Sequence, residues 1–151
     1  MLLDLAEEKD FAHEFRETFE AAGYALRLTP TVLNEMVSAR LEGDRRERTL
    51  ATKAMHRIPQ WRIVPFELNS IEEIMAEQFA DRILRLNLLP PEEWNDAQIL
   101  AETSVAGIPL LVTSDQHLLG IEEDALLLAF QDAELPSARV ASPKRLLRAL
   151  R

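Results

Sequence analysis

The chain of 151 residues contains no cysteine. This absence excludes a disulfide framework, thiolate-bound zinc, an iron–sulfur cluster and a cysteine nucleophile. No window holds the roughly 18 consecutive apolar residues of a membrane span. The chain also does not open with the basic and then apolar segments of a secretory signal. We therefore expect a cytoplasmic protein with no membrane partner.

Several catalytic motifs are absent as well. The sequence has no phosphate-binding P-loop, no glycine-rich dinucleotide motif, no nucleophile elbow and no HExxH pair. A hydride transferase, a serine hydrolase and a zinc protease of that type therefore have no support. The three histidines, His13, His56 and His117, show no ligand spacing to one another, and we expect each to be structural or on the surface.

Positive charge is scarce but concentrated. The formal net charge is −9. Residues 40–62 nevertheless hold seven basic and three acidic residues, and residues 139–151 hold five basic residues and no acid. An acidic total argues against general coating of DNA. The two basic segments are either a rim around an acidic centre or simply two solvated helix faces.

The order of the expected elements is that of an α/β protein. Helices are predicted over residues 7–22, 30–41, 48–58, 70–86, 92–106 and 122–135, with a last one from Ser142-Pro143. Strands are predicted over residues 24–28, 61–64, 108–112 and 139–141. The apolar run 108–112 is typical of a strand buried on both faces. We therefore expect one domain, residues 1–151, with a three-layer α/β/α fold and a mostly parallel central sheet.

Three acids stand where chemistry is expected. Asp115 follows a predicted strand, and ligands bind beyond the carboxyl ends of strands in open α/β sheets. Asp96 shares a helix face with three inward residues, Ile99, Leu100 and Thr103. Glu35 interrupts the apolar stripe of its helix, where it either points inward or reaches water at the edge of the stripe. A buried acid needs a partner or a cation, so the three carboxylates are candidates to hold Mg²⁺ or Mn²⁺.

These segments resemble the PIN-domain family, the nuclease-like fold of VapC-type toxin endoribonucleases. The likeness is carried by residues 29–37 around Glu35, residues 95–101 around Asp96, and residues 107–115, which end in Thr113-Ser114-Asp115. The closing Val140-Ala141-Ser142-Pro143 with Leu146-Leu147 is also similar to the family. The resemblance implies a metal-dependent ribonuclease in which Glu35, Asp96 and Asp115 are catalytic and bind Mg²⁺ or Mn²⁺. It further implies an antitoxin protein partner and a homodimer.

The N-terminus departs from the family pattern. The family opens with a central strand that ends in its first acid, whereas this chain starts at Met1-Leu2-Leu3-Asp4. Either the first strand and acid precede Met1, which we prefer, or Asp4 is the first acid and residues 1–3 are a stub of the strand. This departure leaves a second hypothesis open: a non-catalytic PIN-like module that binds nucleic acid, or that binds a protein by pairing its carboxylates with an arginine.

Overall fold

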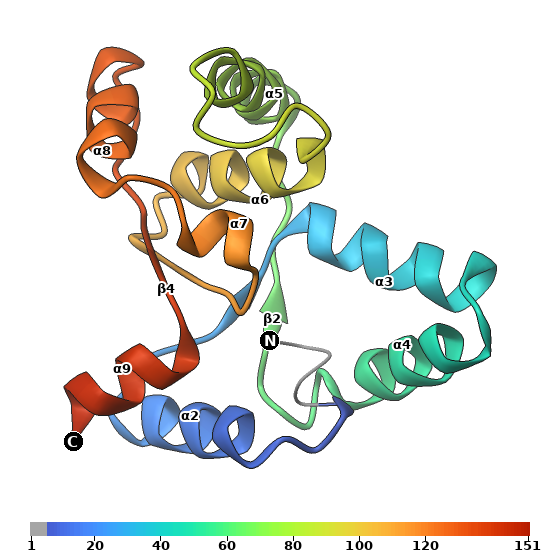
Figure 1. Ribbon diagram of the computed structural model, residues 1–151. Helices are drawn as coiled ribbons and strands as arrows, with labels where there is room; N and C mark the ends of the chain where they lie inside the picture. The colour runs from blue at the N-terminus through green and yellow to red at the C-terminus, as the bar shows by residue number, and fades with distance from the viewer. Residues whose placement is uncertain (1–5) are drawn as a thin grey trace. The chain divides into compact units, whose positions relative to one another are not determined.

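The computed structural model describes residues 6–151, except for the side chain of Asp10. Within this part the chain forms eight helices and four short strands (Figure 1). The chain divides into two compact units. The first comprises Met1–Phe66 together with Pro143–Arg151, and the second is Glu67–Ser142. That the whole chain folds as one domain stays a prediction.

Helices carry most of the described chain. They are α2 (Asp10–Ala21), α3 (Pro30–Glu42), α4 (Arg45–Arg57), α5 (Ser70–Arg85), α6 (Trp94–Val105), α7 (Gln116–Leu119), α8 (Glu123–Asp132) and α9 (Pro143–Leu150). The strands are β1 (Arg27–Leu28), β2 (Val64–Pro65), β3 (Leu110–Val112) and β4 (Arg139–Ala141). Among the residues that the structure describes, no helix is long and apolar enough to cross a bilayer.

The predicted central sheet is wrong for this part of the chain. The described strands form two separate two-stranded parallel sheets, β1 with β2 and β3 with β4. A three-layer α/β/α fold needs one continuous sheet that helices cover on both faces. Here β2 includes Pro65, which has no N–H to donate to a further strand. Residues 110–112 are only half-buried, so β3 is not the fully buried strand that their apolar run predicts.

Two predictions concern the N-terminus of the chain. The strand stub at residues 1–3 and the assignment of the first acid to Asp4 lie outside the described part of the chain. The positions of β1, β3 and β4 agree closely with the predicted strands. The local pattern therefore located extended segments correctly, but it did not reveal which segments pair.

In the first unit, α3 and α4 pack side by side as a helical hairpin (Figure 1). Thr29 is the N-cap of α3, and its hydroxyl accepts a hydrogen bond from the Val32 N–H; Pro30 is the first residue of the helix. Helix α4 begins with a capping box: the Asp44 side chain accepts from the Glu47 N–H, and the Glu47 side chain accepts from the Asp44 N–H. The capping box lies directly after Gly43, the C-cap of α3, and therefore holds the turn between the two helices.

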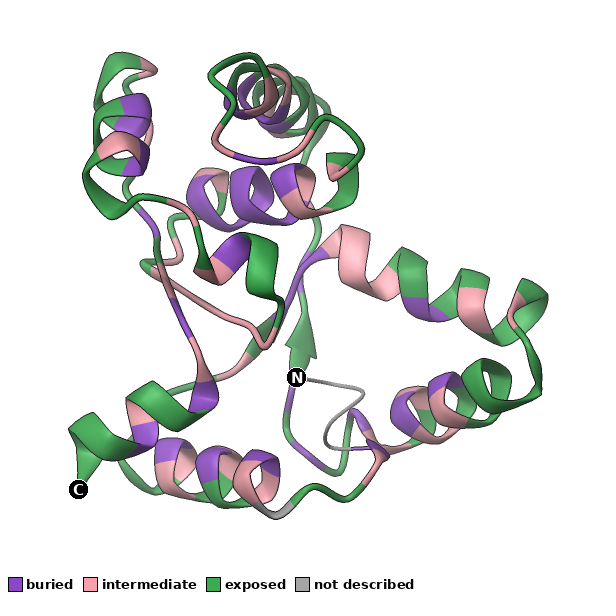
Figure 2. Cartoon of the chain, viewed as in Figure 1, coloured by how far each residue is buried: buried purple, intermediate pink, exposed green. Residues whose placement is uncertain are grey.

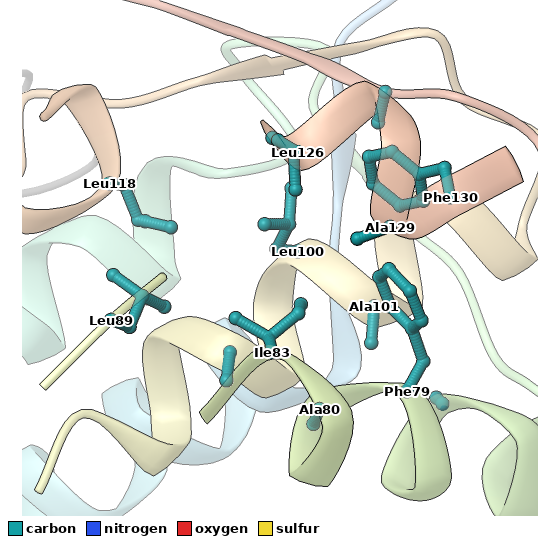
Figure 3. Packing of buried hydrophobic residues seen from close by; sticks show 13 residues of the cluster. Phe79, Ala80, Ile83, Leu89, Leu100, Ala101, Leu118, Leu126, Ala129 and Phe130 are labelled. Atoms are coloured by element: carbon teal, nitrogen blue, oxygen red, sulfur yellow. The ribbon is translucent and has the colours of Figure 1, made fainter. Parts of the chain in front are cut away.

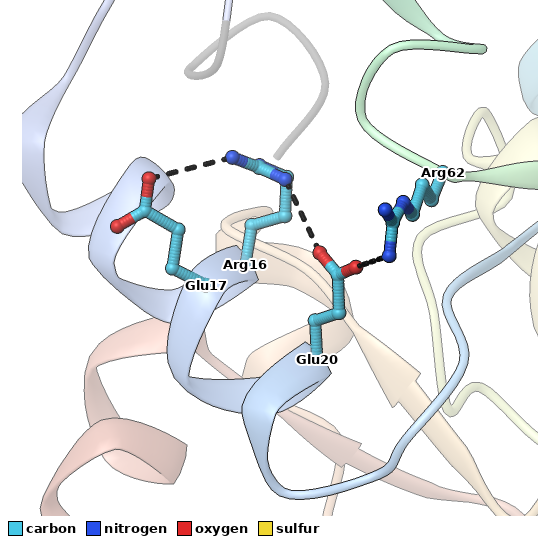
Figure 4. A network of polar contacts seen from close by, with 4 residues as sticks. All are labelled: Arg16, Glu17, Glu20 and Arg62. Atoms are coloured by element: carbon cyan, nitrogen blue, oxygen red, sulfur yellow. Dashed lines mark hydrogen bonds and ion pairs between the residues drawn. The ribbon is translucent and has the colours of Figure 1, made fainter.

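A polar network joins α2 to the segment before β2 in the same unit (Figure 4). Arg16 lies 3.5 Å from both Glu17 and Glu20, and the other carboxylate oxygen of Glu20 accepts from Arg62 at 2.5 Å. Arg62 has a φ of 55°, in the left-handed region. Glu20 therefore links a helix to a loop that follows it by some forty positions in the sequence.

The second unit is built around α5 and α6 (Figure 3). Its core packs large apolar side chains against alanines, among them Ile83, Leu100 and Phe130, which are fully buried. The rings of Phe79 and Phe130 stack with centroids 4.9 Å apart. The alanines let α5 and α6 approach closely, because their side chains end at Cβ.

Helix α5 begins at Ser70, where its predicted range of residues 70–86 also begins, but its capping residue differs from the predicted one. Asn69 is the N-cap and accepts from the N–H groups of Ile71 and Glu72, while Glu72 accepts from the Asn69 N–H. The sequence predicts a Ser70–Glu73 capping box instead. An asparagine is as good an N-cap as a serine, and the neighbouring Asn-x-x-Glu spacing supplies the same reciprocal pair of hydrogen bonds.

Candidate metal centre

Glu93 occupies the N-cap position of α6, yet its carboxylate makes no capping hydrogen bond. Glu122 stands at the same position of α8, and its carboxylate accepts from the N–H groups of Asp124 and Ala125. Oε1 of Glu93 lies instead 3.3 Å from Nδ1 of His117. The carboxylate of Glu93 is thus turned toward another side chain rather than toward its own helix.

Asp96 follows Glu93 by one helical turn, and residues three apart lie on the same side of a helix. Its helix face continues through Ile99, Leu100 and Thr103, which are all buried, as their spacing predicts. Asp96 itself is half-buried, at the end of this inward face. A carboxylate in the first turn of a helix is also stabilised by the helix dipole.

Asp115 is the N-cap of the short helix α7. Its Oδ1 accepts from the N–H groups of His117 at 2.8 Å and Leu118 at 3.1 Å. The Asp115 N–H donates in turn to the hydroxyl of Thr113 at 3.0 Å. Asp115 therefore holds the backbone that carries His117, and the same Oδ1 lies 3.9 Å from His117 Nδ1. Thr113 therefore supports the turn that carries Asp115.

Glu93, Asp96 and His117 form a possible cation site. One ligand atom from each can be chosen so that all three lie within 4.8 Å of one another. Ligand atoms lie about 2.0–2.2 Å from Zn²⁺ or Mg²⁺, so two ligands of one such ion are at most about 4.4 Å apart. Three ligands cannot all stand opposite one another, so side-chain shifts of about 1 Å would be needed to bring the three atoms onto a single ion.

The donor set also bears on the choice of metal. Two carboxylates and one imidazole combine hard oxygen ligands with a nitrogen ligand. Mg²⁺ prefers oxygen throughout, whereas imidazole suits first-row transition metals. Of the two ions expected from the sequence, Mn²⁺ fits Glu93, Asp96 and His117 better than Mg²⁺.

The three acids predicted from the sequence lie in different places relative to the cluster of Glu93, Asp96 and His117. Asp96 belongs to the cluster, and Asp115 borders it through His117. Glu35 is exposed on α3, in the first unit, which agrees with the alternative that it reaches water. Glu35 lies in the first unit and Asp96 and Asp115 lie in the second, so their convergence stays a prediction.

Three residues of interest were missed by sequence reasoning. Glu93 and His117 join the cluster, although the histidine was assigned to the surface or to a structural role. The spacings Glu93-x-x-Asp96 and Asp115-x-His117 were the available signals. Glu102 in α6 is only 4% exposed, and its position three residues after the inward Ile99 was the signal for its burial.

Comparisons with protein-family models, with curated proteins and with solved structures found no match to this chain. The resemblance to PIN domains therefore depends on the segments quoted from the sequence itself.

Proposed function

We propose that this protein is a divalent-cation-dependent ribonuclease that hydrolyses phosphodiester bonds. The single observation that carries the proposal is the gathering of ligand atoms from Glu93, Asp96 and His117 within 4.8 Å of one another. Two carboxylates with one imidazole are a suitable ligand set for Mn²⁺. The quoted resemblance to VapC-type toxins supplies the substrate class, RNA.

Each residue of the site has a defined part in this proposal. Glu93, Asp96 and His117 hold the cation, and Asp115 fixes the turn from which His117 projects. A divalent ion held there lowers the pKa of bound water and neutralises charge on the scissile phosphate. The second oxygen of Asp115 is not used in its helix cap. This oxygen is suited to accept a proton or a hydrogen bond from the attacking water.

The resemblance adds a biological setting to the same proposal. It suggests the toxin of a toxin–antitoxin pair, acting as a homodimer in the cytoplasm and inhibited by an antitoxin protein. Glu35 is retained in this proposal as a third catalytic acid on the strength of its sequence segment.

The test is cleavage of a labelled single-stranded RNA with and without Mn²⁺. We expect cleavage that needs the cation, that EDTA abolishes and that Asp96→Asn reduces to background. Glu92→Gln is the matched control, because Glu92 is an exposed acid beside the cluster and outside it. Cleavage by Asp96→Asn at the unmodified rate, or cleavage that persists in EDTA, would refute the proposal.

One further outcome separates the two functions that the sequence left open. If the protein binds Mn²⁺ but cleaves no RNA, the ribonuclease proposal fails. The same carboxylates would then favour the non-catalytic module, because a pair of carboxylates binds a partner's guanidinium group through two parallel hydrogen bonds.

A further inference from the structure

Helix α4 of the first unit carries five basic residues and a single acid, and these basic side chains divide between two stripes. The side chains of the first stripe form ion pairs with acids of the same unit. Arg46 pairs with Glu7 at 2.8 Å, and Lys53 and Arg57 lie 3.0 and 3.5 Å from Glu8. These contacts also lower the pKa of both glutamates, chiefly through hydrogen bonds from Lys9 and Arg46 to Glu7 and from Lys53 to Glu8.

The basic residues of the second stripe do not pair with Glu7 or Glu8. Arg45, Arg48, Thr52 and His56 recur at helical spacings of three and four, and all four are exposed. In the described part of the chain, neither the Arg45 nor the Arg48 guanidinium has an ion pair. Figure 2 shows the first turns of α4 as exposed. This stripe, Arg45, Arg48, Thr52 and His56, is called the α4 basic stripe below.

Two shallow pockets run along the α4 basic stripe. One of about 400 Å³ is lined by Arg45, Arg46, Thr49 and Leu50. The other, of about 510 Å³, is lined by Arg48, Thr49, Thr52, Lys53 and His56. Both depressions are wide open to solvent, so the basic side chains that border them are accessible to a partner.

The opposite face of α4 is fixed in the core of its unit. Ala54 and Ile58 are buried members of the apolar cluster, and Leu50 packs against it. A helix that inserts into a bilayer interface needs a free apolar face, and this one is already covered. A partner would therefore bind the α4 basic stripe through charge and not through apolar contacts.

We propose that the α4 basic stripe binds the phosphodiester backbone of single-stranded RNA. The stripe spans about 17 Å along the helix, at a rise of about 1.5 Å per residue. Arginine forks and hydroxyl groups are the side chains that contact phosphate oxygens. The net charge of −9 does not oppose this, because charges more than about 10 Å away are largely screened at physiological salt.

The proposal concerns binding alone and does not need the metal cluster, although the choice of RNA rests on the proposed ribonuclease function. Binding of labelled single-stranded RNA is measured by fluorescence anisotropy in EDTA, which removes divalent cations. We expect Arg45→Gln with Arg48→Gln to weaken binding at least about tenfold. The slope of log affinity against log salt should fall by about 1.4, because each phosphate that an arginine neutralises on a single strand adds about 0.7 to that slope.

The chain offers a matched control on α5. Arg82 and Arg85 are also three residues apart on a helix, but they pair with Asp132 at 3.9 Å and Asp81 at 2.8 Å. Arg82→Gln with Arg85→Gln removes the same charge and should leave RNA binding within about twofold. Equal weakening by both double variants would overturn the proposal, because net charge alone would then explain binding.

Two further measurements keep the result interpretable. Arg45→Lys with Arg48→Lys retains the charge, so the salt slope should be restored, and circular dichroism confirms that each variant is folded. Poly-glutamate of equal charge should compete at least about tenfold less well than RNA. Equal competition would replace the phosphate backbone with an acidic protein as the partner.

The outcomes also distinguish this inference from the ribonuclease proposal. RNA binding in EDTA without cleavage in Mn²⁺ would refute the ribonuclease and leave the α4 basic stripe supported. Cleavage in Mn²⁺ with RNA binding unchanged by the Arg45 and Arg48 substitutions would do the reverse.

Discussion

Nδ1 of His117 lies 3.3 Å from Oε1 of Glu93, although Glu93 precedes α6 and His117 lies in α7 of the second unit. Glu93 is free to make this approach because its carboxylate does not cap α6. His117 is held in place by the hydrogen bond from its own N–H to Asp115. This pair adds an imidazole to the candidate metal site, whereas the sequence predicts a site made of carboxylates alone.

Removal of the imidazole should weaken metal binding and change its selectivity. We expect His117→Ala to lower the affinity for Mn²⁺ about 10- to 100-fold, by analogy with the effect of removing groups that surround metal sites. The preference for Mn²⁺ over Mg²⁺ should shrink as well, because only oxygen ligands remain. Calorimetric titration with each ion measures both effects.

The location of the bound ion can be checked directly. Paramagnetic broadening by Mn²⁺ should be strongest for the amide signals of Glu93, Asp96 and His117, and Glu92→Gln should leave it unchanged. Broadening centred on another part of the chain would contradict the assignment of the site.

Glu35 gives a separate test of the acid predicted on α3. If it acts with the other acids, Glu35→Gln should slow Mn²⁺-dependent RNA cleavage at least about a hundredfold, the usual contribution of a proton-transferring group. The free energy of unfolding should change by less than about 0.5 kcal/mol, because Glu35 is exposed. Glu42→Gln, which alters another exposed acid of the same helix, is the control. A Glu35→Gln variant as active as this control would remove Glu35 from the site.

Helix α8 allows the core of the second unit to be tested with a matched pair. Leu126 is 5% exposed and Leu128 is 57% exposed. Leu126→Ala should lower the free energy of unfolding by about 2–5 kcal/mol, because it leaves a cavity among packed side chains. Leu128→Ala should change it by less than about 0.5 kcal/mol. Urea unfolding followed by circular dichroism measures both, and equal destabilisation would show that the described packing of α8 is wrong.

The contact between Glu8 and Lys53 predicts a pH effect of known sign. The hydrogen bond from Lys53 holds the pKa of Glu8 below its ordinary value in the folded protein. The resulting stability is present above the unfolded pKa of about 4.3 and is lost as the pH falls through the lower, folded pKa. The effect is small because Glu8 is exposed and the pair is screened by solvent.

An NMR titration of the side-chain carboxyl carbon of Glu8 measures this shift. Lys53→Met should raise the pKa of Glu8, and Lys53→Arg should keep it low. A Glu8 pKa that does not respond to Lys53→Met would show that the ion pair does not form in solution.

Local elements were predicted well from the sequence, and the reason is physical. Thr29-Pro30 at the start of α3 and Gly107 after α6 are signals that act within a few neighbouring residues. Gly107 adopts a φ of 71°, which other residues rarely tolerate. Hydrophobic spacing likewise placed Leu100 and Thr103 on the buried face of α6.

Pairing between distant segments was decided only by the tertiary structure. The same apolar pattern describes a strand in a large sheet and one in a two-stranded sheet, so residues 110–112 did not reveal that β4 is their partner in this part of the chain. Nor did any local signal bring His117 to Glu93. The sequence by itself determined most of the helices and the acid Asp96 at the end of an inward face, because these depend on nearest neighbours. It missed the helical turn of α7, and it placed the start of α4 at residue 48 instead of Arg45. The folded chain alone decided which strands pair and which imidazole joins the acids, because such contacts depend on the packing of segments that are remote in the sequence.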